Sequence, residues 1–141
     1  SLDWHPTNHC SFKDNGGIWP PHCVQGSRGA EIHKAFYTDV LTHNIRPQKH
    51  NIFFKGTNPA KEQYSGYEAV NASGISIEDA STHDIIIAGI ASEYCVMETA
   101  MDFVKRGFNV SIIVGALAYV DKAGHEKALA EFRSKGINLL Y

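Results

Sequence analysis

One cysteine lies where a helix is expected to begin, directly after a strongly apolar strand. Cys95 follows the β-branched run 84–90 (DIIIAGI) and falls in the first turn of a predicted helix over 93–106, with Ser92 as its N-cap. The N–H groups of a first helical turn lack intrahelical partners, and the helix dipole adds partial positive charge there, so both favour a thiolate. Cys95 is therefore a candidate nucleophile, and its position alone is equally consistent with a buried structural cysteine.

A lysine ends a second apolar run. Lys55 follows residues 51–54 (NIFF), which predict a short buried strand, and precedes Gly56 and Thr57. A lysine at the end of a strand is most often a solvated surface charge. Beside a thiolate or a carboxylate, its ammonium group would instead favour the charged form of that neighbour.

Carboxylate and imidazole side chains cluster near the start of the chain. Asp3, His5 and His9 lie within DWHPTNH, and His22 follows in WPPHC. Such ligands suit zinc, iron or manganese, and three protein ligands leave positions open for water or substrate. A surface loop rich in histidine is one alternative. A closed structural zinc site is another, although the paired spacing of such sites is lacking; its ligands would be His9, Cys10, His22 and Cys23.

The elements that must position these residues alternate in the second half of the chain. Strands are predicted over 84–90, 109–114 and 137–141, with helices over 93–106 and about 122–135 between them. Strands and helices in this order favour an α/β fold with a parallel sheet, whose strands are covered on both faces. In the first half, 1–28 is predicted to be an ordered loop, 29–43 a helix, and 58–73 loop with some helix.

Composition excludes several classes of protein. The 141 residues are 43% hydrophobic and carry a formal charge of −2, without the basic stripe that nucleic acid binding requires. No stretch approaches the roughly 20 apolar residues of a membrane helix. An odd count of three cysteines argues against a disulfide framework and favours the cytoplasm. The chain begins with Ser1 rather than Met, so the sequence leaves open whether a targeting segment precedes it.

Three sets of motifs resemble the nicotinamidases of the isochorismatase-like cysteine hydrolase family. They are DWHPTNHCSF with GGIWPPHCVQG, then KGT with YSGY, and finally IIIAGIASEYCVMETAMDFVKRGFNV. The resemblance covers nearly the whole chain. It implies one isochorismatase-like domain over 1–141, with a three-layer parallel sheet flanked by helices.

The resemblance also implies a role for individual residues. Cys95 would be the nucleophile, Lys55 a member of an Asp-Lys-Cys triad, and the N–H groups of Ala91 and Cys95 an oxyanion hole beside a cis peptide at Ile90–Ala91. The implied substrate pocket comprises Trp19, Tyr64 and Ile90. The implied ligands of a divalent metal, zinc before iron or manganese, are Asp3, His5 and His22, with His9 as a fourth ligand in some members and Ser11 behind them.

The activity implied is the conversion of nicotinamide to nicotinate and ammonia through a thioester, in NAD salvage, with related pyridine and pyrazine carboxamides as further substrates. A homo-oligomer without nucleic acid or membrane partners is expected. The interpretation requires the Cys95 sulfur and the Asp/His cluster to face one small cavity. Two alternatives remain: another isochorismatase-like amide hydrolase, which would lack the metal, and a non-catalytic module that binds metal or nicotinamide.

The family's first central strand, with the aspartate that takes the thiol proton, has no counterpart here. In the family it lies well upstream of the DWHP motif, but only two residues precede Asp3. A truncated or cleaved chain is the favoured explanation, ahead of a strand supplied by a second chain or a natural variant without hydrolase activity. We expect residues 1–141 alone to be inactive.

Overall fold

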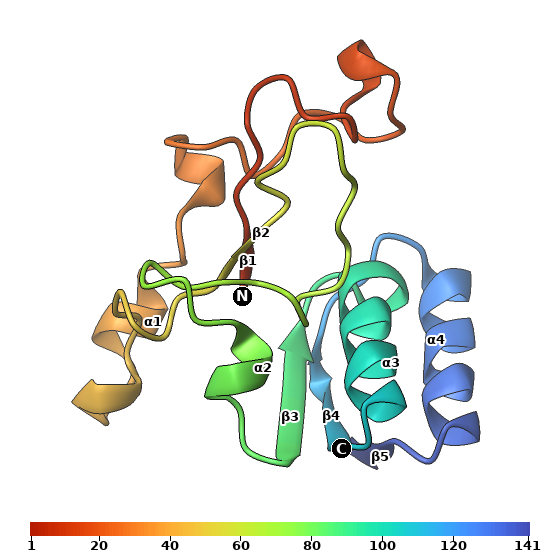
Figure 1. The fold of residues 1–141 in the computed structure, drawn as a ribbon. Helices are drawn as coiled ribbons and strands as arrows, with labels where there is room; N and C mark the ends of the chain where they lie inside the picture. The colour runs from red at the N-terminus through yellow and green to blue at the C-terminus, as the bar shows by residue number, and fades with distance from the viewer. The chain divides into compact units, whose positions relative to one another are not determined.

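Three parallel strands organise the second half of the chain. The computed structural model describes all of residues 1–141, which form two compact units, Ser1–Ile77 and Glu78–Tyr141, here called the N-terminal and the C-terminal unit. The strands of the C-terminal unit are β3 (Asp84–Gly89), β4 (Asn109–Leu117) and β5 (Asn138–Leu140), in the order β3-β4-β5 (Figure 1). The predicted parallel sheet is therefore confirmed.

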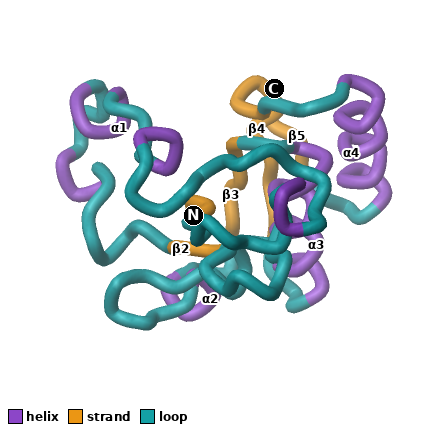
Figure 2. Tube along the Cα trace, turned by 90° about the horizontal axis from the view of Figure 1, so that it is seen from above, coloured by secondary structure: helices purple, strands orange, loops and turns teal.

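Two helices connect these strands and lie on one side of the sheet. The first is α3 (Met97–Lys105), which contacts β4, and the second is α4 (Lys122–Ser134), which contacts β5. Because successive strands are added in the same direction, right-handed crossovers place both helices on the same face, as Figure 2 shows. A further short helix, α2 (Ile77–Ala80), precedes β3.

The two faces of this sheet differ in burial. Val110 and Ile112 of β4 are 6% and 0% exposed, on the same side as their partners in β3. On the opposite side, Ile86, Ile113 and Leu140 are 65%, 39% and 37% exposed. The expectation that the β-branched run is covered on both faces therefore holds for the helical face only.

The helix that follows β3 starts differently from the prediction. A π-helical turn, η4 (Ser92–Val96), precedes α3, and the Val96 N–H donates to the Ala91 carbonyl at 3.1 Å. Ala91, rather than Ser92, occupies the N-cap position. Ser92 does not cap because its hydroxyl is engaged by the side chains of Glu93 and His125. The predicted helix end is confirmed, since Gly107 follows α3 with a φ of +86°.

The N-terminal unit is built mainly of loops around one short parallel pair. β1 (Leu2–Asp3) pairs with β2 (Phe54–Lys55), and the register sets Asp3 beside Lys55. Phe12, Phe53 and Tyr67 are buried in this unit. Its short helices are η1 (Lys13–Asn15), η2 (Arg28–Ala30), α1 (Ala35–Thr38) and η3 (His43–Ile45).

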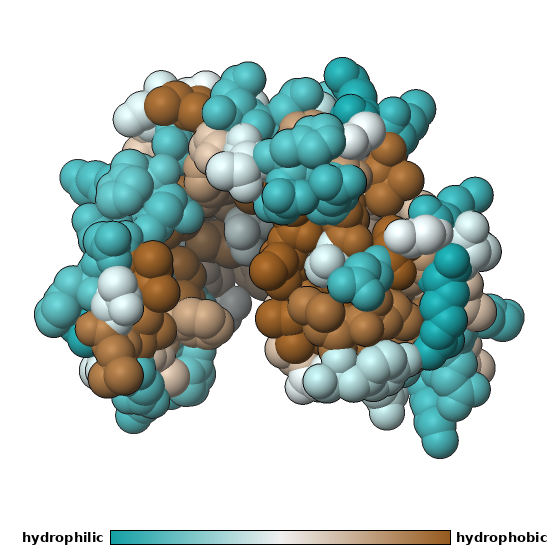
Figure 3. Space-filling model, turned by 90° about the horizontal axis from the view of Figure 1, so that it is seen from below, coloured by the Kyte–Doolittle hydropathy of each residue, from teal (hydrophilic) through white to brown (hydrophobic).

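The predicted helix over 29–43 is wrong, because α1 is the only helix that lies wholly within this range, while η2 and η3 overlap its two ends. No residue of α1 is buried, so the segment lacks the packed apolar face that stabilises most short helices. Leu41, which follows α1, is 92% exposed. Figure 3 shows apolar surface, coloured brown, at the left of the molecule, the side on which Figure 1 shows α1. The helix expected within 58–73 is absent as well.

No helix in the chain has the length and apolar composition needed to cross a bilayer.

Candidate functional site

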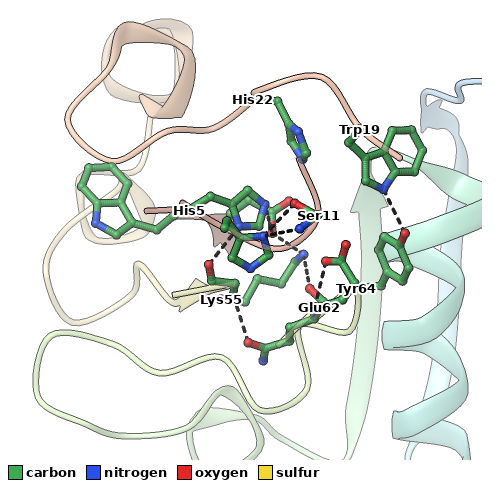
Figure 4. A network of polar contacts seen from close by, with 12 residues as sticks. His5, Ser11, Trp19, His22, Lys55, Glu62 and Tyr64 are labelled. Atoms are coloured by element: carbon green, nitrogen blue, oxygen red, sulfur yellow. Dashed lines mark hydrogen bonds and ion pairs between the residues drawn. The ribbon is translucent and has the colours of Figure 1, made fainter. Parts of the chain in front are cut away.

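The Asp/His cluster is assembled by an extended segment that pairs with a loop. Asp3 ends β1, and His5 lies two residues on, so both side chains project to the same side of the extended chain. The His5 N–H donates to the Cys23 carbonyl at 3.0 Å, which brings the neighbouring His22 to the cluster. One ligand atom from each of Asp3, His5 and His22 lies within 4.8 Å of the others. Figure 4 shows His22 reaching toward His5 from its loop.

His5 is held in the orientation that metal binding requires. Its Nδ1 lies 2.9 Å from the Gly56 carbonyl oxygen, so Nδ1 carries the proton and Nε2 keeps its lone pair. Gly56 has a φ of +64°, and a Cβ there would come within 2.5 Å of His5 Nδ1. Burial lowers the pKa of His5 despite the opposing effects of the Gly56 carbonyl and Asp3. The imidazole is therefore neutral, as a metal ligand must be.

His9 supplies an observation that fits a bound ion. Its ring is fully buried and lies 4.1 Å from the His5 ring, centroid to centroid. The Nδ1 atom is 2.7 Å from Ser11 Oγ and accepts the Ser11 N–H at 3.2 Å, whereas the buried Nε2 has no hydrogen-bond partner. Buried polar atoms without partners are rare and costly, and a cation would satisfy this one after displacing the proton that an accepting Nδ1 leaves on Nε2. The donor set therefore fits a divalent metal.

The rival closed zinc site does not form. Cys10 and Cys23 form no disulfide, and neither belongs to the group of close ligand atoms. The cluster that does form combines a carboxylate with imidazoles, as an open site for zinc, iron or manganese does.

Lys55 is not a solvated surface charge. Its side chain is only 5% exposed, and its Nζ donates to Asp3 Oδ1 at 2.5 Å and to the Gln63 carbonyl at 3.0 Å. The parallel register of β1 and β2 places the two charges side by side. Gln63, which the sequence did not single out, also accepts the Gly56 N–H through Oε1 at 2.9 Å. The lysine thus connects the carboxylate of the cluster to the loop after β2.

Trp19 and Tyr64, both predicted to line a substrate pocket, contact each other. Trp19 Nε1–H donates to the Tyr64 hydroxyl at 2.9 Å, as drawn in Figure 4. The Trp19 N–H donates to the Ser11 carbonyl at 2.9 Å, and the ring lies 6.3 Å from that of His22. The indole is therefore fixed next to the Asp/His cluster.

In the C-terminal unit, Cys95 lies on η4, just beyond the carboxyl end of β3. The cis peptide expected at Ile90–Ala91 is present. Cys95 forms no disulfide and is partly exposed, which favours a reactive group over a buried structural cysteine. Carboxyl ends of parallel strands are where open α/β sheets bind ligands. Ile90 is 65% exposed and Ala91 8%.

A polar cluster beside Cys95 was missed by the sequence reasoning. The Glu93 carboxylate accepts the N–H groups of Val120 and Asp121, both at 2.7 Å from Oε1. The Ser92 hydroxyl donates to Glu93 Oε2 at 3.1 Å and lies 2.8 Å from His125 Nδ1. Burial alone would raise the pKa of Glu93, but hydrogen bonds, led by that from the Asp121 N–H, hold it below its usual range. An acidic residue in a first helical turn was the only signal in the sequence.

The predicted site residues therefore form two groups, one in each unit. The N-terminal unit brings together Asp3, His5, His9, His22 and Lys55, with the Trp19–Tyr64 pair. The C-terminal unit carries Ile90, Ala91 and Cys95 on one turn.

Comparison with known proteins gives consistent matches. The isochorismatase domain matches residues 3–140. The nicotinamidase of Escherichia coli is 30% identical over 133 residues, which cover 80% of this chain and 59% of that protein. The pyrazinamidase of Pyrococcus horikoshii, solved in complex with zinc, superposes with a TM-score of 0.80 at 38% identity, covering 99% of this chain and 72% of that one. The PnC1 protein of L. infantum, solved in complex with nicotinate, gives 0.79 at 36% identity, covering 99% and 68%.

The chain is shorter than these relatives, spanning about 59% of the length of the bacterial nicotinamidase. The structural matches extend over both units and confirm the isochorismatase-like α/β fold with helices flanking parallel strands.

Proposed function

We propose that this chain, which belongs to the isochorismatase family, acts within a cytoplasmic nicotinamidase. This enzyme converts nicotinamide to nicotinate and ammonia for NAD salvage. The observation that carries the proposal is the combination, in one chain, of an Asp/His cluster beside Trp19 and Tyr64 with a partly exposed thiol on a strand-end turn. The relatives named as a nicotinamidase and as a pyrazinamidase support it.

The chemistry we assign to the C-terminal unit is acyl transfer to sulfur. The Cys95 thiolate forms a bond to the carboxamide carbon, and the oxygen becomes an oxyanion that the N–H groups of Ala91 and Cys95 stabilise. The C–N bond then breaks, the nitrogen takes the proton that had left the thiol, and ammonia leaves. Water next attacks the thioester, releasing nicotinate and returning the thiol.

The chemistry we assign to the N-terminal unit is charge compensation and ring binding. The Lys55 ammonium compensates the charge of the Asp3 carboxylate beside it. Trp19 and Tyr64 offer aromatic surface for a pyridine or pyrazine ring. The aspartate that the resemblance implies as proton acceptor has no counterpart among residues 1–141, so we expect this chain alone to bind the amide without turning it over.

Asp3, His5 and His22 would hold a divalent ion, with His9 as a further ligand; zinc is the ion we propose. The ion would supply a fixed positive charge that orients the ring nitrogen. Binding of the ion at this cluster is supported by the unpartnered Nε2 of His9 and by the lowered pKa of His5, which favours the neutral imidazole.

The test is ammonia release from nicotinamide by the zinc-loaded protein as its gene encodes it, with the 141-residue chain measured beside it. Benzamide, which lacks the ring nitrogen, is the matched control substrate. We expect hydrolysis of nicotinamide, much slower hydrolysis of benzamide, and complete loss on Cys95→Ala with ring binding retained.

Three results would contradict the proposal. Equal rates on both amides in a metal-free preparation would favour another amide hydrolase of the family. Binding of nicotinamide without hydrolysis by the complete protein would favour a non-catalytic module. A normal rate from residues 1–141 alone would refute the triad assignment.

A further inference from the structure

The turn that carries Cys95 is fastened to the segment between β4 and α4. The backbone provides one set of links, because the Ser92 N–H donates to the Ala118 carbonyl at 2.9 Å and the Ala118 N–H donates to the Gly89 carbonyl at 3.1 Å. These bonds fix where the turn begins. The position of the rest of the turn, up to Cys95, depends on side-chain contacts.

Ser92, Glu93 and His125, here called the latch, provide the second set of links. Glu93 Oε1 accepts from Val120 and Asp121, the two residues that lead into α4, each at 2.7 Å. The Ser92 hydroxyl donates to Glu93 Oε2 at 3.1 Å, and its oxygen therefore accepts a hydrogen bond from His125 Nδ1–H at 2.8 Å. Each donor in this chain of contacts meets an acceptor, so the arrangement specifies one conformation.

Packing leaves the latch little freedom. A Cβ added at Gly124, in the first turn of α4, would lie 3.2 Å from Glu93 Cγ. The His125 ring stacks on Tyr119, with centroids 4.7 Å apart. The first turn of α4 therefore packs against the Glu93 side chain, and the backbone of Val120 and Asp121 binds its carboxylate.

The latch is not itself a hydrolytic triad, although it contains serine, histidine and a carboxylate. Ser92 is 0% exposed, and its hydroxyl lies between two partners, so it cannot reach a substrate. The carboxylate contacts the serine and not the imidazole, the reverse of what a triad needs.

We propose that the latch is a positioning device for the nucleophile. Glu93 lies two residues before Cys95 on the same π-helical turn, and π-helical turns are frequent at functional sites. By holding this turn to the start of α4, the latch keeps the Cys95 sulfur and the neighbouring backbone N–H groups aligned on one carbonyl group. The inference rests on the proposed role of Cys95 and deepens it.

The expected effect is on turnover more than on substrate binding. A displacement of about 1 Å at reacting groups can cost about 100-fold in rate. The latch residues touch the turn, whereas ring binding is assigned to other residues. Loss of the latch should therefore lower kcat by about 10-fold or more and change KM by less than about threefold.

The experiment compares Glu93→Ala with Glu93→Gln in the complete, zinc-loaded protein. Glutamine keeps an oxygen for the N–H groups of Val120 and Asp121, so it should retain at least about a third of wild-type kcat. Glu126→Ala, which removes an exposed carboxylate from α4, is the matched control and should match wild type.

A second readout does not depend on amide hydrolysis. The rate of Cys95 alkylation by iodoacetamide, followed on its own peptide by mass spectrometry, should fall at least about threefold in Glu93→Ala and recover in Glu93→Gln. If the protein failed to hydrolyse nicotinamide, this rate would still decide the role of the latch.

A parallel pair guards against misfolding. His125→Asn keeps an N–H donor near Ser92, and His125→Leu removes it, so only the leucine variant should show reduced kcat and slower alkylation. The proposal is overturned if Glu93→Ala and His125→Leu fold, lose thermal stability, and still match wild type within about twofold in kcat and alkylation rate.

Discussion

Replacing Gly56 by alanine should separate the cost of backbone strain from the cost of displacing a metal ligand. Gly56 has a φ of +64°, where a residue with a Cβ pays about 1–2 kcal/mol. The new Cβ would also come within 2.5 Å of His5 Nδ1. His5 is 2% exposed, so its ring cannot move away without disturbing its neighbours.

The second cost can be sized from the contacts of His5. Moving the ring breaks the 2.9 Å bond between Nδ1 and the Gly56 carbonyl, worth about 1 kcal/mol. Loss of such an orienting partner lowers metal affinity by about 10- to 100-fold, or about 1.4–2.7 kcal/mol. Gly56→Ala should therefore lose about 2–3 kcal/mol of unfolding free energy and at least about tenfold in zinc affinity.

Gly74→Ala is the matched control. Gly74 has a φ of +77°, but no atom lies within 4 Å of an added Cβ. It should pay the strain alone, about 1–2 kcal/mol, and keep wild-type zinc affinity. Urea unfolding of the metal-free proteins and zinc titration against a competing chelator measure the two quantities. Equal zinc affinities for the two variants would refute the assignment of His5 as an oriented ligand.

Three further predictions concern the same unit. Lys55→Met should destabilise the metal-free protein by about 2 kcal/mol, because Asp3 loses its buried partner, and zinc should stabilise this variant more than wild type in urea unfolding; an equal gain would contradict the pairing. His9→Phe should destabilise the metal-free protein by about 1–3 kcal/mol, because the buried Ser11 groups lose their partner at Nδ1, and weaken zinc binding about tenfold; unchanged binding in calorimetry would exclude His9 as a ligand. Because the pKa of His5 is lowered in the folded state, the unfolded chain binds the proton first, so metal-free stability should fall as the pH drops below about 6.5 toward that lowered pKa. Urea midpoints at about pH 7.5 and pH 5.5 should then differ less in His5→Gln than in wild type, and an equal difference would contradict burial as the cause.

The C-terminal unit could be predicted closely because its signals are local. The β-branched runs and the glycines at 107 and 136 marked strands and helix ends, and the structure confirms β3, α3, β4, α4 and β5 within a few residues. The segment 29–43 misled because its apolar residues are spaced as in a helix yet have nothing to pack against. Propensity alone does not stabilise so short a helix.

Some residues of the candidate site could be predicted from the sequence and others could not. Asp3, His5 and His22 were singled out by residue type and motif, and the structure brings them together. The contact of Ser92 with His125 spans 33 positions, and no periodicity or motif in the sequence connects the two. The same is true of Gln63, whose role depends on how the loop after β2 returns to Lys55.

The placement of the proposed ligands has a consequence for chain entropy. His5 and His22 bracket residues 6–21, a loop whose internal contacts include the backbone bridge between Phe12 and Trp19. An ion shared by both histidines would join the two ends of this loop in the folded state and release them on chelation. Chelation should then open 6–21 to proteases before the rest of the N-terminal unit, with Trp19 released in the first fragment.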